Sequence, residues 1–256
     1  MKQVQLLCVV CMLFFATSVR AEQFSIAAAA DLKFAMDEIV AGFKKENPGT
    51  ILTVTYGSSG KFHTQIQQGA PFDLFFSADI SFPRELARAG LASSEVKPYA
   101  VGRIVLWSAR MDAAKITLTS LTDPKTTRIA IANPKHAPYG KRAEEALKSS
   151  GLWERLQSKF VYGENIAQAA QYVQSGNAQV GIIALSLALS PELARSGGYY
   201  LIPDKLHNPL EQGFIITKTG AGKQTVRRFA DFMGSKKVRE IMTRYGFVLP
   251  GEAADK

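Results

Sequence analysis

Four short segments of small, polar or Tyr residues each lie between a strand-like apolar run and a helix-like run. They are residues 27–31, 57–60, 133–140 and 163–166. A strand-to-helix junction exposes unpaired backbone N–H groups at the positive end of the helix dipole, where small anions bind. If the four junctions meet in the fold, they would enclose an anion with neutral donors and without any Lys or Arg.

Three hydroxyl side chains in these segments could add further donors, namely Ser58, Ser59 and Tyr139. Pro138 fixes the backbone before Tyr139, and Gly140 permits a tight turn into the next helix. Taken singly, Ser59 could be an ordinary helix cap, and Tyr139 could be a half-buried aromatic residue in a loop. The prediction of an anion site therefore rests on the four segments together.

The same residues do not fit common catalytic motifs. Around the Gly60-Lys61 pair, Thr55 stands where a phosphate-binding P-loop needs glycine, and Phe62 stands where it needs Ser or Thr. The same stretch also lacks the G-x-S-x-G spacing of a hydrolase nucleophile. The histidines lie far apart, with no carboxylate or thiolate at ligand spacing. We predict a protein that is not an enzyme, that needs no cofactor and that has no side-chain metal ligands.

The N-terminus has the pattern of a secretory signal peptide. Lys2 precedes the apolar run 6–16, and residues 19–21 end in a pattern typical of cleavage. We predict a signal peptide at 1–21 and a periplasmic protein that begins at Glu22. Both cysteines, Cys8 and Cys11, fall inside the signal peptide, so the exported chain would have no disulfide and no thiolate metal site.

The positive charge does not indicate a nucleic-acid partner. The formal net charge of the chain is +9, and removal of Lys2 and Arg20 with the signal peptide leaves 9 − 2 = +7. The remaining Lys and Arg are scattered and form no arginine-rich run interleaved with aromatic residues. We interpret them as solvated surface, which would raise the local concentration of an anionic ligand.

The elements that position the four segments alternate between strand and helix, which is typical of an α/β fold. We expect strands near 24–30, 51–56, 74–77, 101–107, 128–132, 159–162, 180–185 and 214–217. Apolar residues recur with helical periodicity in 32–43, after Asn165, and in two C-terminal segments. Ligands of open α/β sheets bind beyond the carboxyl ends of strands, which is where the four segments fall.

The predicted architecture is two lobes of mixed sheets flanked by helices, with the ligand cleft between them. Lobe 1 would comprise 22–100 and, after a return crossing, 213–256. Lobe 2 would comprise 101–212. Two chain crossings of this kind bring the strand-to-helix junctions of the two lobes face to face.

These residues resemble the periplasmic molybdate-binding proteins of ABC importers, which have the type II periplasmic binding protein fold. The matching stretches are 27–32, 57–60, 69–79, 133–140 and 244–250, in order along the chain. The strings G-A-P-x-D-x-F-x-S-A-D and N-P-x-x-A-P-Y-G are the specific ones. The resemblance implies that the protein captures molybdate, and tungstate, and delivers it as a monomer to a membrane permease with its ATPase subunit.

Carried over by position, the ligand contacts of the family fall on Ala30, Asp31, Ser58, Ser59, Tyr139 and Ile166. The resemblance implies a tetrahedral dianion held by hydroxyl and backbone N–H donors, with no direct ligand to the metal atom. Selection against sulfate would then depend on cavity size. The alternative is a receptor for another tetrahedral oxyanion, such as phosphate, arsenate or sulfate.

Asp31 departs from the family pattern, which commonly has Ser or Asn at this position. An ionised carboxylate only accepts hydrogen bonds, and a unit charge 4 Å from a dianion costs roughly 8 kcal/mol at an effective dielectric constant of 20. We expect the side chain to cap the helix at 32–43 instead of pointing inward. Alternatively, Asp31 accepts a proton from a hydrogen-bearing oxyanion, which would favour phosphate or arsenate.

Overall fold

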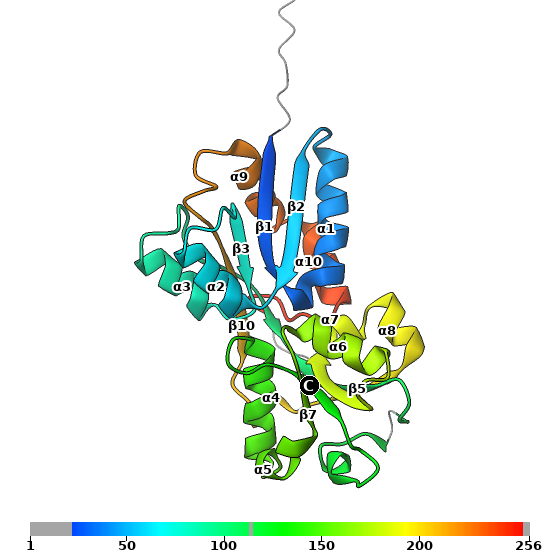
Figure 1. The fold of residues 1–256 in the computed structure, drawn as a ribbon. Coiled ribbons are helices and arrows are strands. Elements are labelled where there is room, and N and C mark those ends of the chain that lie inside the picture. The colour runs from blue at the N-terminus through cyan, green and yellow to red at the C-terminus, as the bar shows by residue number, and fades with distance from the viewer. Residues whose placement is uncertain (1–21, 113–114, 253–256) are drawn as a thin grey trace, which may run out of the picture.

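The computed structural model describes residues 22–112 and 115–252, and the predicted signal peptide lies outside the described residues. The chain forms two lobes, each built on a five-stranded mixed sheet (Figure 1). Within the described residues, no helix combines the length and apolar character that a membrane span requires.

The first lobe has the strand order β2-β1-β3-β10-β4. Its strands are β1 (Gln23–Ala29), β2 (Ile51–Gly57), β3 (Leu74–Ser77), β4 (Lys97–Gly102) and β10 (Leu210–Ile216). Strand β1 is parallel to β2 and β3, whereas β10 lies between β3 and β4 and is antiparallel to both. A strand from near the end of the chain therefore completes the sheet that the N-terminus begins.

Side chains that alternate along these strands bury two faces of the first sheet. On one face, Phe24 packs with Phe43 and Phe229 under helices α1 (Lys33–Glu46), α9 (Gln224–Phe232) and α10 (Lys236–Arg244). On the other face, Phe75 packs with Phe62 and Leu86, which belong to helices α2 (Ser59–Gln67) and α3 (Ser81–Arg88).

The second lobe has the strand order β7-β6-β8-β5-β9. Its strands are β5 (Ile104–Ser108), β6 (Ile129–Ala132), β7 (Phe160–Gly163), β8 (Val180–Ala184) and β9 (Gly198–Leu201). Its helices are α4 (Pro138–Ser149), α5 (Trp153–Leu156), α6 (Ile166–Gln174), α7 (Leu185–Ala188) and α8 (Pro191–Ser196). The three inner strands β6, β8 and β5 are wholly buried, which explains their continuous apolar runs in the sequence, whereas the edge strands β7 and β9 are partly exposed.

Two crossings join the lobes. One is the single residue Arg103 between β4 and β5, and the other is segment 202–209 between β9 and β10. The guanidinium Nε of Arg103 lies 3.9 Å from Oδ1 of Asp204, so the two crossings run side by side. The closing segment of the chain pairs with β4, just before the first crossing, through hydrogen bonds between Val101 and Val248.

Strand limits differ from the sequence expectation mainly at the crossings. The apolar run 101–107 is divided at Arg103 between two sheets, and β9 was not expected. The predicted lobe limits at 100 and 212 fall inside β4 and β10, respectively. Apolarity indicates that a run is buried, but it does not show to which sheet each half of the run belongs.

Candidate functional site

The four segments meet in a cavity between the lobes, which we call the interlobe cavity. It is lined by residues 29–31, 57–59, 78, 137–139 and 165–166. The lining includes all six predicted contact residues, namely Ala30, Asp31, Ser58, Ser59, Tyr139 and Ile166. The structure thus brings together residues from both lobes, while their role as oxyanion ligands stays a prediction.

Four helical segments begin at the interlobe cavity. They are the 3-10 turn η1 (Ala30–Leu32) and helices α2, α4 and α6, which begin at Ser59, Pro138 and Ile166. The N–H groups of a first helical turn have no partner within the helix, and the helix dipole adds partial positive charge at that end. These helix ends contribute partial positive charge to a cavity that no Lys or Arg lines, and Asp31 is the one ionisable carboxylate in its lining.

Two glycines permit the close contacts around this site. A Cβ atom on Gly60 would lie 2.5 Å from the backbone oxygen of His136 across the cleft. A Cβ atom on Gly140 would lie 2.1 Å from the backbone oxygen of Ala132, so only glycine lets α4 start this close to β6. Backbone N–H of Gly60 donates to the His136 oxygen at 3.0 Å, which joins the lobes directly.

The two serines at the start of α2 have different partners. The Ser58 hydroxyl donates to the backbone oxygen of His136 at 2.5 Å, so its hydrogen joins the lobes. The Ser59 hydroxyl oxygen accepts a hydrogen bond from the backbone N–H of Ala78 at 3.0 Å, which leaves its own hydrogen free to donate. Neither serine makes a cap hydrogen bond to α2, so Ser59 is the side chain best placed to donate to an anion.

Asp31 is almost fully buried and binds across the cleft. Its Oδ2 accepts hydrogen bonds from the Tyr139 hydroxyl at 2.9 Å and from Nε2 of Gln212 at 2.8 Å. The start of α1 has no side-chain cap. The expectation that Asp31 caps this helix is therefore wrong, because its side chain is held by a tyrosine of the second lobe and a glutamine of β10.

Burial dominates the electrostatics of this pair. Desolvation raises the pKa of Asp31 to about 6, although the hydrogen bonds from Gln212 and Tyr139 oppose the shift. Burial and the charge of Asp31 hold the pKa of Tyr139 well above its ordinary value, so the phenol stays protonated. The Tyr139 hydrogen is directed to Asp31 in this structure, and not into the cavity as the sequence indicated.

The family can be assigned from the sequence. A model of the bacterial extracellular solute-binding proteins matches residues 24–248. The chain belongs to this family. The molybdate-binding protein ModA of Rhodobacter capsulatus is 38% identical to the chain over 224 residues, which cover 87% of this chain and 86% of that protein.

Azotobacter vinelandii supplies two further relatives of this solute-binding protein. Its molybdate-binding protein ModA is 35% identical over 236 residues, which cover 91% of this chain and 93% of that protein. The solved structure of a periplasmic molybdate-binding protein from this organism matches with a TM-score of 0.83 at 31% identity. The match covers 89% of this chain and 99% of that chain, and it confirms the two-lobe type II periplasmic binding protein fold.

The sequence did not point to two buried polar residues of this solute-binding protein. Gln212 holds both Asp31 and the Tyr139 hydroxyl, the latter at 3.1 Å, and the Ser186 hydroxyl donates to the backbone oxygen of Asp31 at 2.8 Å. Both side chains lie in mainly apolar, buried elements, β10 and α7. A buried polar side chain in such an element needs a hydrogen-bond partner, so the polarity of Gln212 and Ser186 within apolar runs could have singled them out.

Ion pairs join the lobes at the rim of the cleft. Lys61 of α2 pairs with Glu164 of the second lobe, and Arg142 of α4 lies 3.6 Å from Asp79 of the first. Among the described residues, no group of three or more His, Cys, Asp or Glu is arranged to hold a metal ion.

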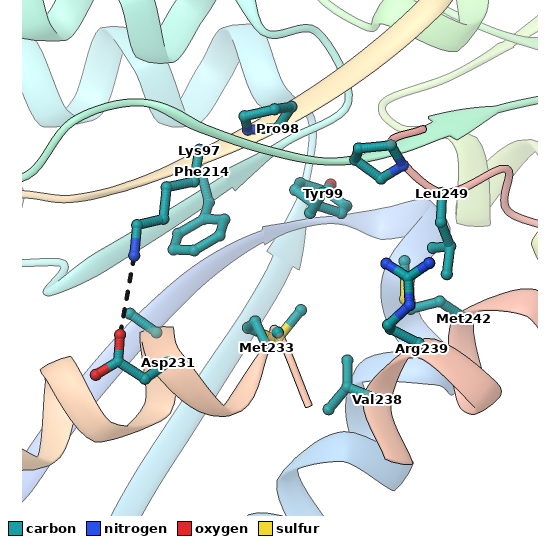
Figure 2. A pocket seen from close by; sticks show the side chains of 13 residues that line it. Lys97, Pro98, Tyr99, Phe214, Asp231, Met233, Val238, Arg239, Met242 and Leu249 are labelled. Carbon is teal, nitrogen blue, oxygen red and sulfur yellow. Dashed lines mark ion pairs between the residues drawn. The ribbon is translucent and has the colours of Figure 1, made fainter. Parts of the chain in front are cut away.

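A second hollow lies in the first lobe, between its sheet and the C-terminal helices. Figure 2 shows Tyr99, Phe214, Met233 and Val238 in its middle, with Arg239 near one end. Lys97 and Asp231 form an ion pair at the other end, 3.8 Å apart. We call this the apolar groove; it has a volume of about 350 Å³.

Proposed function

We propose that this protein binds molybdate, and also tungstate, in the periplasm and delivers it to the membrane permease of an ABC importer. The observation that supports this most is the convergence of four helical N-termini on one cavity that no Lys or Arg lines. The relatives at 38% and 35% identity, which carry the name molybdate-binding protein, support the choice of ligand.

In this proposal neutral donors hold the dianion. Backbone N–H groups in the first turns of α2, α4 and α6 point their partial positive charge at the oxygens, and the free hydroxyl hydrogen of Ser59 adds a side-chain donor. The fixed positions of these donors suit a tetrahedral ion of one size. The role is one of capture and transfer, so no residue needs to act on a chemical bond.

Opening and closing of the lobes would admit the ligand. In this structure the interlobe cavity has a volume of about 10 Å³, which is room for about one water molecule. A tetrahedral oxyanion therefore needs the lobes to part, and the two crossings at Arg103 and 202–209 are the places where they hinge. The bound ligand then stabilises a closed form, which a permease can recognise on a single monomer.

Titration calorimetry tests the proposal. The chain from Glu22 is titrated with molybdate, tungstate, sulfate and phosphate at neutral pH. We expect one-to-one binding of molybdate and tungstate and no heat from the other two anions. The absence of binding heat with all four anions would contradict the proposal.

A serine pair tests the site. Ser59→Ala removes a hydrogen bond to a charged ligand, so we expect molybdate affinity to fall about 10- to 100-fold. Ser149→Ala is the matched control, because Ser149 is exposed at the opposite end of α4 and lies far from the cavity. Equal affinities of the two variants would remove Ser59 from the site.

A receptor for phosphate or arsenate is the second candidate, and Asp31 is the observation that favours it. A carboxylate in the cavity wall can accept a hydrogen bond from a protonated oxyanion, whereas molybdate at neutral pH carries no proton. Binding of phosphate in preference to molybdate in the same titration would establish this second function. If molybdate binds instead, the Asp31 carboxylate must have a role other than accepting a hydrogen bond from a protonated ligand.

A further inference from the structure

The two carboxylate oxygens of Asp31 have different surroundings. Oδ2 already accepts hydrogen bonds from Tyr139 and Gln212, at 2.9 and 2.8 Å. Oδ1 is buried and has no partner in hydrogen-bond geometry, and the nearby backbone N–H groups of Asp31 and Leu32 only partly offset the effect of burial on the pKa of Asp31. Asp31 itself lines the interlobe cavity with only 1% of its surface exposed. A buried oxygen without a partner at the wall of an anion cavity is unfavourable as long as it is negatively charged.

No cation neutralises this carboxylate among the described residues, where it forms no ion pair. The titratable groups that face it are two buried phenols, Tyr139 of α4 and Tyr99 of β4, and each has its pKa raised by burial and by the charge of Asp31. Both phenols are therefore neutral. A dianion entering the cavity would meet an uncompensated negative charge.

The elements packed against η1 add no compensating charge. On α1, Lys33 and Asp37 pair with each other at 2.5 Å on the exposed surface, and the Tyr56 hydroxyl of β2 donates to Asp37. Helix α7 contributes the Ser186 hydroxyl to the backbone oxygen of Asp31. Helix α6 contains no Lys, Arg, His, Asp or Glu. Charge balance at the site must therefore come from Asp31 itself.

We propose that the protein takes up one proton on Oδ1 of Asp31 each time it binds a tetrahedral dianion, so that a neutral carboxyl group donates to the ligand. This inference rests on the proposed function. The proton comes from solvent, and no bond other than the new O–H bond is formed or broken. A neutral carboxyl group has one O–H donor and retains acceptor capacity, so Oδ2 keeps both of its hydrogen bonds.

Gln212 and Tyr139 are positioning residues in this scheme. Their hydrogen bonds occupy Oδ2 and so direct the proton to Oδ1. Gln212 also donates to the Tyr139 hydroxyl at 3.1 Å, which orients the phenol hydrogen towards Asp31. The donor that Tyr139 cannot supply to the anion is thereby replaced by the carboxyl hydrogen of Asp31.

Uptake at neutral pH is consistent with the environment of the side chain. Burial raises the pKa of Asp31 to about 6 before any ligand enters, and a dianion beside it raises the pKa further. Above that range the free protein must gain a proton to bind. Affinity for a dianion should then fall about tenfold for each pH unit, the slope for one proton.

The test is titration calorimetry with molybdate at pH 7.5 in two buffers that differ in ionisation enthalpy, repeated at several pH values up to 9. We expect uptake of close to one proton per molybdate and a tenfold loss of affinity per pH unit. Asp31→Asn should bind without proton uptake and with affinity independent of pH. Asp231→Asn, at the edge of the apolar groove, should behave as the wild type does.

Each result has a distinct meaning. Molybdate binding by the wild type with no proton uptake and no pH dependence overturns the inference and leaves the proposed function standing. Proton uptake that persists in Asp31→Asn overturns the assignment to Asp31. If neither protein binds molybdate at pH 6 or above, the proposed function fails and the inference fails with it. The wild-type buffer experiment decides the question even if Asp31→Asn does not fold.

Discussion

The interlobe cavity and the apolar groove contrast in size and in chemistry. The groove measures about 350 Å³, whereas the cavity measures about 10 Å³. The groove is lined mainly by apolar side chains, and its charged residues lie at its ends (Figure 2). The cavity collects four helical N-termini, a free serine hydroxyl and a buried carboxylate. Size alone would select the groove, whereas the N–H and O–H donors that an anion needs converge on the cavity.

The two hollows also differ in how the chain builds them. The groove lies within one lobe, where α9 and α10 cover the first sheet, so its residues contribute to the stability of that lobe. The cavity depends on both lobes, and its hydrogen bonds form across the cleft. Mutations in the groove should therefore change folding, and mutations in the cavity should change binding.

The largest expected effect is on stability at the groove. Met242 is 2% exposed and packs in the core of the first lobe. Met242→Ala should lower the free energy of unfolding by about 2–5 kcal/mol, since it removes buried methylenes and leaves a cavity. Urea unfolding of the free protein measures this. Molybdate affinity of the folded variant should match the wild type, and a changed affinity would show that groove and cavity are coupled.

A somewhat smaller effect on stability is expected at Asp31, where the cavity also affects folding. Its pKa in the folded protein is raised to about 6 from an ordinary value of 3.8, so the folded state holds this proton more tightly than the unfolded chain. Stability should therefore fall as pH rises from about 4 to about 6, by about 3 kcal/mol, and then stay level. Asp31→Asn lacks this contribution.

The measurement is urea unfolding of both free proteins between pH 4 and pH 8. The difference between wild type and Asp31→Asn isolates Asp31 from the other carboxylates, whose titration is common to both. A difference that is constant with pH would show that Asp31 titrates alike in the folded and unfolded states.

The smallest of these effects concerns closure. Gly60→Ala would place a methyl group 2.5 Å from the backbone oxygen of His136 in the opposite lobe. We expect the overpacking to cost about 1–3 kcal/mol in the closed form, which lowers molybdate affinity about 5- to 150-fold. Calorimetry measures this loss.

Gly234→Ala is the matched control, because it adds the same methyl group to the groove in ordinary contact, 3.4 Å from the Asp231 oxygen. It should leave affinity unchanged. Wild-type affinity in Gly60→Ala would mean that ligand binding does not bring α2 and the His136 segment as close as they lie here.

The sequence predicted the fold and the residues of the cavity well because both depend on local patterns. Apolar runs indicated β1, β2, β3 and β6 to β8 within a few residues. Three of the four strand-to-helix junctions were recognisable from their Ser, Gly or Tyr, and the junction at 27–31 from its place between a strand and a helix. The six predicted residues line one cavity because parallel strands of both lobes end there.

The features that could not be predicted from the sequence depend on contacts between residues that are distant along the chain. Asp31 meets Gln212 only because β10 lies next to β3 in the sheet, and no local pattern encodes that order. The direction of the Asp31 side chain followed from this partner and from Tyr139, so the expected helix cap was wrong. Likewise, the run 101–107 was divided at Arg103 by the pairing of its two halves with different sheets.

The position of β10 also affects how the chain is made. Until residues 210–216 emerge, the edges of β3 and β4 that β10 will occupy have no partner, and Phe24 lacks its contact with Phe229. Strands β5 to β9, by contrast, form one continuous stretch that can fold as a unit. We therefore expect the second lobe to mature first during synthesis and export. The N-terminal strands, although made earlier, would stay open to aggregation until the C-terminus arrives.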